Sequence, residues 1–104
     1  MAKPLTYQVV KNARALIADE KNWCRLRHAE TRWRKTKIEP WSRRAYRFCA
    51  VGAIQRAAYD LVGGGPYPTA FLDLARKTHC EVPAVMGIND GQGHAAVLAV
   101  FDRY

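Results

Sequence analysis

Three cysteines and three histidines are the side chains of this sequence that could perform covalent or metal chemistry. Together they supply the ligand types of a zinc site: Cys24, His28, Cys49, His79, Cys80 and His94. Their spacing argues against zinc, because Cys24 and His28 form at most half of a ligand set and no matching pair follows. The odd number of cysteines disfavours a disulfide framework. We therefore expect no metal, no cofactor and reduced thiols in a cytoplasmic protein.

A thiol enzyme would need a cysteine with a lowered pKa, a neighbouring histidine and an orienting group. These types are present as Cys49, His94, and Asn89 or Asp90. The helical spacing of apolar residues after Ser42, however, predicts a helix that begins near Ser42 and contains Cys49 about two turns from its start. The helix dipole lowers the pKa of a thiol only in the first turn, so it would not activate Cys49. The sequence thus predicts a protein that is not an enzyme and has no catalytic residues. A thiol- or metal-dependent enzyme that uses Cys49 and His94 remains an alternative.

An Asn-Asp-Gly sequence in the last fifth of the chain is a second candidate site. Asn89-Asp90-Gly91 is typical of a turn, and Gly93 or His94 would open a final helix. The free amides of a helix N-terminus favour capping oxygens or anions. We expect Asn89 or Asp90 to cap this helix, and ligand binding by Asn89, Asp90 and His94 is the alternative.

The third candidate is a concentration of positive charge. The 104 residues include 17 Lys+Arg and 9 Asp+Glu, a formal net charge of +8. Residues 1–56 carry +10 and residues 57–104 carry −2, and residues 25–47 alone carry +7, with Trp33, Trp41 and Tyr46 among the charges. The predicted binding residues are Arg25, Arg27, Arg32, Trp33, Arg34, Lys35, Lys37, Arg43, Arg44 and Arg47.

Arginine dominates this basic segment, which points to a polyanionic partner. The guanidinium group pairs bidentately with phosphate or carboxylate and stacks on rings, and neighbouring aromatic side chains can support single-stranded bases. The simpler interpretation is a solvated, charge-rich surface. We predict a small binding protein whose partner is a polyanionic macromolecule, with nucleic acid favoured. The alternative is an interaction or inhibitor module for an acidic protein.

One small domain must position these candidates. A hydrophobic content of 49% and a charged content of 25% are typical of a globular protein, and no apolar run approaches the roughly 20 residues that span a membrane. Predicted helices cover residues 6–19, 42–62 and 70–78, with Thr6, Ser42 and Thr69 as N-caps, and a last helix follows Gly93. Residues 83–88 form a helical turn or a buried strand. We predict a mainly α, single-domain bundle (1–104) of about four helices, in which residues 24–42 form an inserted basic loop or short β-ribbon.

Three short motifs, in this order, resemble a family of small uncharacterised bacterial and phage proteins that is labelled as a domain of unknown function. They are Trp23-Cys24, a Cys49-x-x-Gly52-Ala53 helix, and Asn89-Asp90 ahead of a terminal helix. The resemblance implies an architecture and no activity. It suggests a family-motif cluster of Trp23, Cys24, Cys49, Gly52, Asn89, Asp90 and His94. In this cluster we expect Trp23 to lie on the small-residue face at Gly52 and Cys24 to lie near Cys49.

Overall fold

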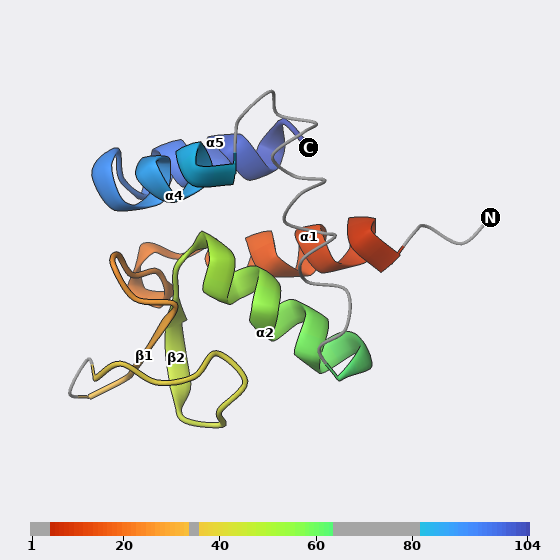
Figure 1. Ribbon diagram of the computed structural model, residues 1–104, viewed down its shortest axis with the longest axis vertical. Coiled ribbons are helices and arrows are strands. Elements are labelled where there is room, and N and C mark those ends of the chain that lie inside the picture. Colours follow the sequence, from red (N-terminus) through yellow and green to blue (C-terminus); the bar gives the residue numbers. More distant parts are fainter. Residues whose placement is uncertain (1–4, 34–35, 64–81) are drawn as a thin grey trace.

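The computed structural model describes residues 5–33, 36–63 and 82–104 of the chain (Figure 1). Its elements are α1 (Leu5–Leu16), a 3₁₀ helix (Glu20–Asn22), β1 (Ala29–Thr31), β2 (Ala45–Phe48), α2 (Ala50–Val62), α4 (Val82–Gly91) and α5 (His94–Asp102). Helices α1 and α2 lie side by side, with α4 and α5 beyond one side of them and the β1–β2 ribbon beyond the other. The prediction of a mainly α domain with a short β-ribbon is confirmed.

Helix α1 forms because its apolar residues recur at helical spacing and face the core. Val9, Val10, Ala13 and Ile17 are fully buried. The helix ends at Leu16, earlier than the predicted Asp19. Asp19 instead caps the following 3₁₀ helix, because its carboxylate accepts a hydrogen bond from the Lys21 amide. Thr6, the predicted N-cap, lies inside the first turn of a helix that begins at Leu5.

The predicted start of the second helix at Ser42 is wrong. Residues Ala45–Phe48 form strand β2, and α2 begins only at Ala50. Strand β2 pairs antiparallel with β1, with Ala29 opposite Phe48 and an irregularity between Glu30 and Thr31. The expected ribbon therefore exists, but its second strand lies beyond residues 24–42. The strand forms because pairing with β1 satisfies the backbone N–H and C=O groups of residues 45–48. Ser42 does not distinguish the two structures, because serine favours turns as well as helix N-caps.

The N-terminus of α2 comes very close to the chain ahead of β1. A Cβ atom on Gly52 would overlap the carbonyl group of His28, whose oxygen also accepts a hydrogen bond from the Cys49 amide. The backbone of His28, rather than the predicted Trp23 ring, therefore makes the closest approach at Gly52. The small residues Ala53 and Ala57 on the same helix are buried in the core beside α1.

Glycine residues mark the end of α2 and the point where the chain reverses between α4 and α5. Helix α2 ends as predicted, with Gly63 in the left-handed conformation at φ 82°. The apolar residues 83–88 belong to helix α4, which resolves the ambiguity between helix and strand. The predicted turn at Asn89-Asp90-Gly91 is wrong, because these residues are the last turn of α4 and the chain reverses at Gln92 and Gly93.

Helix α5 begins at His94, after Gly93 with φ 105°, and buries Val97, Val100 and Phe101. The predicted start of this helix is confirmed. The predicted helix over residues 70–78 lies outside the described residues. In the part of the chain that the structure describes, no helix is long and apolar enough to cross a bilayer.

Candidate functional site

The family-motif cluster is a hydrogen-bonded junction built around Asn89, whose side chain is fully buried. Its Oδ1 atom accepts hydrogen bonds from the Trp23 indole at 2.8 Å and from the Ala50 amide at 2.9 Å. Its Nδ2 group donates to the Cys24 carbonyl at 3.2 Å and to Asp90 at 2.9 Å. Two acceptor and two donor positions saturate a carboxamide. Asn89 thus joins α4, the start of α2 and the Trp23–Cys24 segment, and has no capacity left for a ligand.

The predicted capping of the last helix by Asn89 or Asp90 is wrong. The N-cap of α5 is Gly93, which makes no side-chain capping bond. Asn89 instead satisfies the first amide of α2, because the loop before α2 lies next to the end of α4. Asp90 accepts a hydrogen bond from the Leu26 amide at 2.9 Å. That bond holds Leu26 at φ 67°, a left-handed conformation that leucine rarely adopts, with its side chain 81% exposed.

The remaining cluster members are also engaged within the fold. The Nε2 atom of His94 lies 2.6 Å from the Ile17 carbonyl oxygen, so this nitrogen acts as a hydrogen-bond donor. Its ring lies 5.5 Å from that of Trp23, and the Arg25 guanidinium lies 5.2 Å from the Trp23 ring. A nitrogen that donates to a carbonyl group cannot accept a proton from a thiol.

The two described thiols, Cys24 and Cys49, are buried and free. Cys49 is the N-cap of α2, where its sulfur accepts a hydrogen bond from the Gly52 amide at 3.3 Å, so the predicted position two turns inside the helix is wrong. Burial nevertheless raises the pKa of Cys49 to about 11 and that of Cys24 to about 12. The neighbouring Cys49 raises the pKa of Cys24 further. At neutral pH both sulfurs are therefore weak nucleophiles.

Among the described residues, no group of three or more His, Cys, Asp or Glu side chains could hold a metal ion. Of the six zinc-type candidates, His79 and Cys80 lie outside the described residues. Cys24, Cys49 and His94 have the structural contacts given above, and His28 is exposed at the end of the loop before β1.

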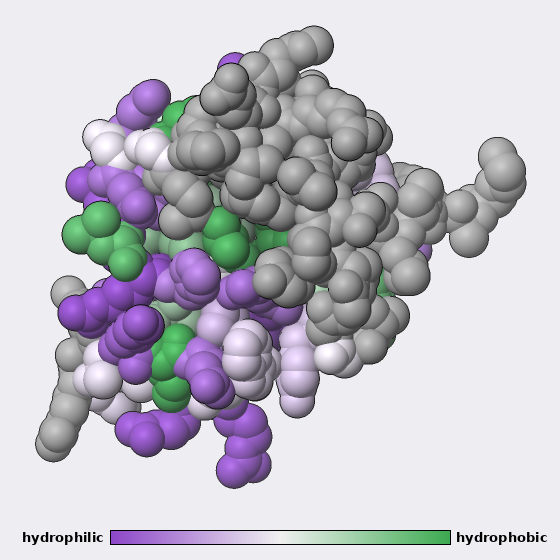
Figure 2. Space-filling view, viewed as in Figure 1, coloured by the Kyte–Doolittle hydropathy of each residue, from purple (hydrophilic) through white to green (hydrophobic). Residues whose placement is uncertain are grey.

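The basic segment lies on and around the β1–β2 ribbon. Hydrophilic side chains gather over this end of the molecule (Figure 2). Seven of the predicted binding residues are exposed: Arg25, Arg27, Arg32, Trp33, Lys37, Arg43 and Arg44. Arg47 is half-buried, and Arg34 and Lys35 lie outside the described residues. Arg27 forms an ion pair with Glu30 at 3.6 Å, so one carboxylate of the segment is partly neutralised.

Arginine and aromatic side chains form a continuous stack across the ribbon. The Arg32 guanidinium lies 4.8 Å from the Trp33 ring and 5.1 Å from the Tyr46 ring, and Arg47 lies 5.4 Å from Tyr46. The Nη1 group of Arg47 donates to the carbonyl oxygens of Thr31 and Arg32, each at 3.0 Å. Trp33 is 84% exposed. The ribbon therefore presents an open indole beside arginines that are already oriented.

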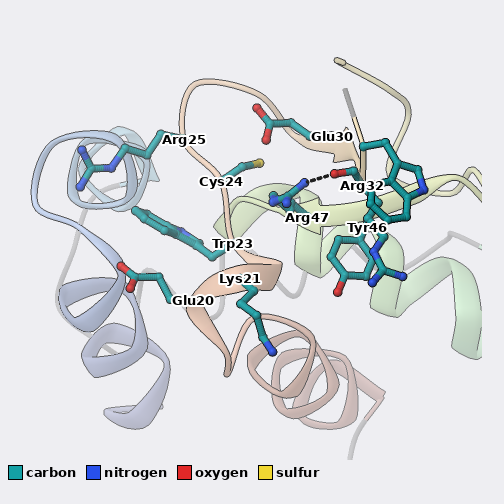
Figure 3. Close-up of a pocket in the computed structure, with 10 residues that line it drawn as sticks. Glu20, Lys21, Trp23, Cys24, Arg25, Glu30, Arg32, Tyr46 and Arg47 are labelled. Carbon is teal, nitrogen blue, oxygen red and sulfur yellow. Dashed lines mark hydrogen bonds between the residues drawn. The ribbon is translucent and has the colours of Figure 1, made fainter. Parts of the chain in front are cut away.

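Two open grooves flank this stack and share Arg32, Trp33 and Tyr46 as a common wall. The first, which we call the aromatic groove, has a volume of about 870 Å³ (Figure 3). It is lined by Glu20, Lys21, Trp23, Cys24, Arg25, Glu30, Arg32, Trp33, Tyr46 and Arg47. In Figure 3, Glu20, Trp23 and Arg25 lie on one side of it and Arg32 and Tyr46 on the other.

The second, which we call the cationic groove, has a volume of about 790 Å³. Its lining contains four cations and no carboxylate among the described residues: Arg32, Lys37, Arg43 and Arg44 are the cations. The structure thus places seven of the predicted residues in the lining of two adjoining grooves of different character. Arg27 lines neither groove.

Glu20 and Lys21 line the aromatic groove but were not predicted as site residues. They belong to the 3₁₀ helix, which lies beside β2 in the fold. No local signal in the sequence could have identified them, because this contact joins segments more than 20 residues apart in the chain.

The family model of DUF6197, a family of unknown function, matches residues 1–104, and the chain therefore belongs to this family. The match includes the basic segment as well as the three motifs. No curated protein and no solved structure gives a significant match to the chain.

Proposed function

We propose that this member of a family of unknown function is a nucleic-acid-binding protein that contacts its partner through the β1–β2 ribbon. The observation that carries the proposal is the cationic groove, in which Arg32, Lys37, Arg43 and Arg44 meet without an opposing carboxylate among the described residues. A groove of one charge sign concentrates the opposite charge. A linear polyanion with regularly spaced phosphates matches four cations along a groove of about 790 Å³.

The remainder of the molecule supports this assignment by providing a rigid base. The ribbon is fixed to the core because Cys24 donates its amide hydrogen to Phe48 and Cys49 donates to His28. Arg56 also donates to the Pro40 and Ser42 carbonyls, at 3.1 and 2.8 Å, and so anchors the loop that precedes Arg43 and Arg44. Cations on an anchored loop lose less conformational entropy on binding than cations on a free chain.

The proposal includes a cytoplasmic location, where nucleic acid is available and thiols stay reduced. The buried, free Cys24 and Cys49 suit such a compartment. A bacterial or phage setting is part of the same proposal.

Fluorescence anisotropy with labelled DNA and RNA oligonucleotides, titrated across a range of salt concentrations, tests the function. If the four cations each neutralise one phosphate, the logarithm of the binding constant falls with the logarithm of salt concentration with a slope of about −3 for single strands. The double variant R43A/R44A should roughly halve this slope. The matched control K11A removes an exposed cation of α1, outside both grooves, and should leave the slope unchanged.

The absence of oligonucleotide binding at low ionic strength would refute the proposed function and favour an acidic protein as the partner. A slope that R43A/R44A does not change would also count against it, because binding would then not use the cationic groove.

A further inference from the structure

We infer that the nucleic acid bound by this surface is single-stranded, with its phosphates in the cationic groove and an unpaired base in the aromatic groove. This inference rests on the proposed function and specifies its ligand. Three features support it: the difference in charge between the two grooves, the exposure of the Trp33 indole in the wall that they share, and the size of the aromatic groove.

The two sides of the wall differ in charge. Each groove has four cations in its described lining, but the aromatic groove also contains two carboxylates, Glu20 and Glu30, whereas the cationic groove contains none. Because Glu30 is paired with Arg27, Glu20 is the carboxylate that is free to act on a ligand. Carboxylates repel phosphate groups but accept hydrogen bonds from the amino and imino groups of bases. A strand that crosses the wall is therefore better placed with its phosphates on the side of Arg43 and Arg44 and its bases on the side of Glu20.

The wall itself is a stacking platform. Trp33 is 84% exposed, so most of its ring surface is open to a base, and Arg32 lies against both Trp33 and Tyr46. Base–aromatic stacking is favourable for every base, which gives affinity without sequence preference. In a duplex the base faces are already stacked on one another and cannot reach this ring. Only an unpaired base can use Trp33 as the structure presents it.

The aromatic groove is large enough to hold a base with its sugar. Its volume of about 870 Å³ lies within the range of roughly 300–1,000 Å³ of small-molecule sites. Arg47, which donates to the carbonyls of Thr31 and Arg32, lies between the two sides in Figure 3. Main-chain contacts therefore hold at least one cation of the groove, the Arg47 guanidinium, in place before a base enters.

The test compares a labelled oligonucleotide of about 15 nucleotides, as DNA and as RNA, with the same strand annealed to its complement. The wild-type protein should bind the single strands at least about tenfold more tightly than the duplex at physiological salt, because only the single strands stack on Trp33. W33A should weaken single-strand binding about tenfold and change duplex binding less than about twofold. The control Y59A removes a half-exposed aromatic side chain of α2 that lines neither groove, and should bind both forms as the wild type does.

The outcomes separate the inference from the proposed function. Equal affinity for single strands and duplex, or a W33A variant that binds single strands as tightly as the wild type, overturns the single-strand inference. If R43A/R44A still reduces the salt slope in that case, the nucleic-acid function stands with a duplex as its ligand. Binding of only one of the two single strands, RNA or DNA, with weaker binding of its duplex, supports the inference and identifies which single strand is bound. Because Trp33 is mostly exposed, W33A should unfold at the wild-type denaturant concentration, and circular dichroism checks this.

Discussion

Asn89 connects three segments of the chain through one carboxamide, and its replacement is the sharpest test at the level of single residues. Asn89→Ala leaves the Trp23 indole N–H, the Ala50 amide and the Cys24 carbonyl buried without their partner. Each orphaned polar group costs about 1–3 kcal/mol. We expect the free energy of unfolding to fall by about 3–5 kcal/mol, measured by urea denaturation.

Asn12→Ala is the matched control, because Asn12 is exposed on α1. It should change the free energy of unfolding by less than about 0.5 kcal/mol. If the two variants lay within about 1 kcal/mol of each other, Asn89 would not be the junction described here.

The buried thiols allow a prediction on pH. Burial raises the pKa of Cys49 to about 11 and that of Cys24 to about 12, from an ordinary value of 9.0. Above pH 9 the unfolded chain loses these protons before the folded protein does. The unfolded state then binds fewer protons, so the free energy of unfolding decreases as the pH rises from about 9 towards 12.

Alkylation followed by peptide mass spectrometry measures how accessible and how reactive each buried thiol is. At pH 8, iodoacetamide should label Cys24 and Cys49 slowly in the native protein and rapidly in denaturant. Fast labelling of native Cys49 would show an accessible thiolate and would revive the alternative of a thiol enzyme.

At the level of elements, the contact between α2 and the chain ahead of β1 depends on one missing side chain. Gly52→Ala adds a Cβ atom that would overlap the His28 carbonyl, and this carbonyl cannot move freely because it accepts the Cys49 amide hydrogen. Although alanine favours a helix by about 1 kcal/mol over glycine, the clash should dominate. We expect a net loss of about 1–3 kcal/mol of stability in thermal and urea unfolding.

Gly87→Ala provides the comparison within the same fold. Gly87 is exposed in α4, and no described atom lies within 4 Å of the position its Cβ would take. This variant should gain about 0.5–1 kcal/mol of stability from helix propensity. A stabilising Gly52→Ala would contradict the close approach of α2 to His28.

The sequence predicted elements with a clear local signal and missed those that depend on distant pairing. Apolar spacing located α1 and α5, and Gly63 located the end of α2. Residues Ala45–Phe48 fit a helix by spacing, yet they form a strand because Ala29–Thr31 pairs with them. The sulfur cap of Cys49 was missed because cysteine is not a typical N-cap, and Leu26 has no local signal for its left-handed φ.

For the candidate site as a whole, the sequence indicates the charges but not their arrangement. The basic residues and Trp33 were visible from composition, and most of them share one end of the molecule. Their division into an aromatic groove and a cationic groove depends on the ribbon register and on the position of the 3₁₀ helix. Both are tertiary features that no window of the sequence contains.

A concentration of like charge on one end of a small domain should cost stability when no polyanion is bound. Arg32, Lys37, Arg43 and Arg44 share one groove, and the net charge of the chain is +8. Their mutual repulsion acts over about 30 Å at 0.01 M salt and only about 3 Å at 1 M. We therefore expect the free energy of unfolding to increase as sodium chloride is raised from about 0.01 M to about 0.5 M.

Two charge-removing variants test whether the salt dependence of the free energy of unfolding comes from the cationic groove. R43Q/R44Q should be more stable than the wild type at low salt by roughly 0.5 kcal/mol and should depend less on salt. Arg103→Gln removes an exposed cation from residues 57–104, which carry a net charge of −2, and should bring no such gain. Urea denaturation at several salt concentrations measures all three proteins. If R43Q/R44Q lost stability at low salt, these arginines would stabilise the fold, and their clustering could not be explained by binding alone.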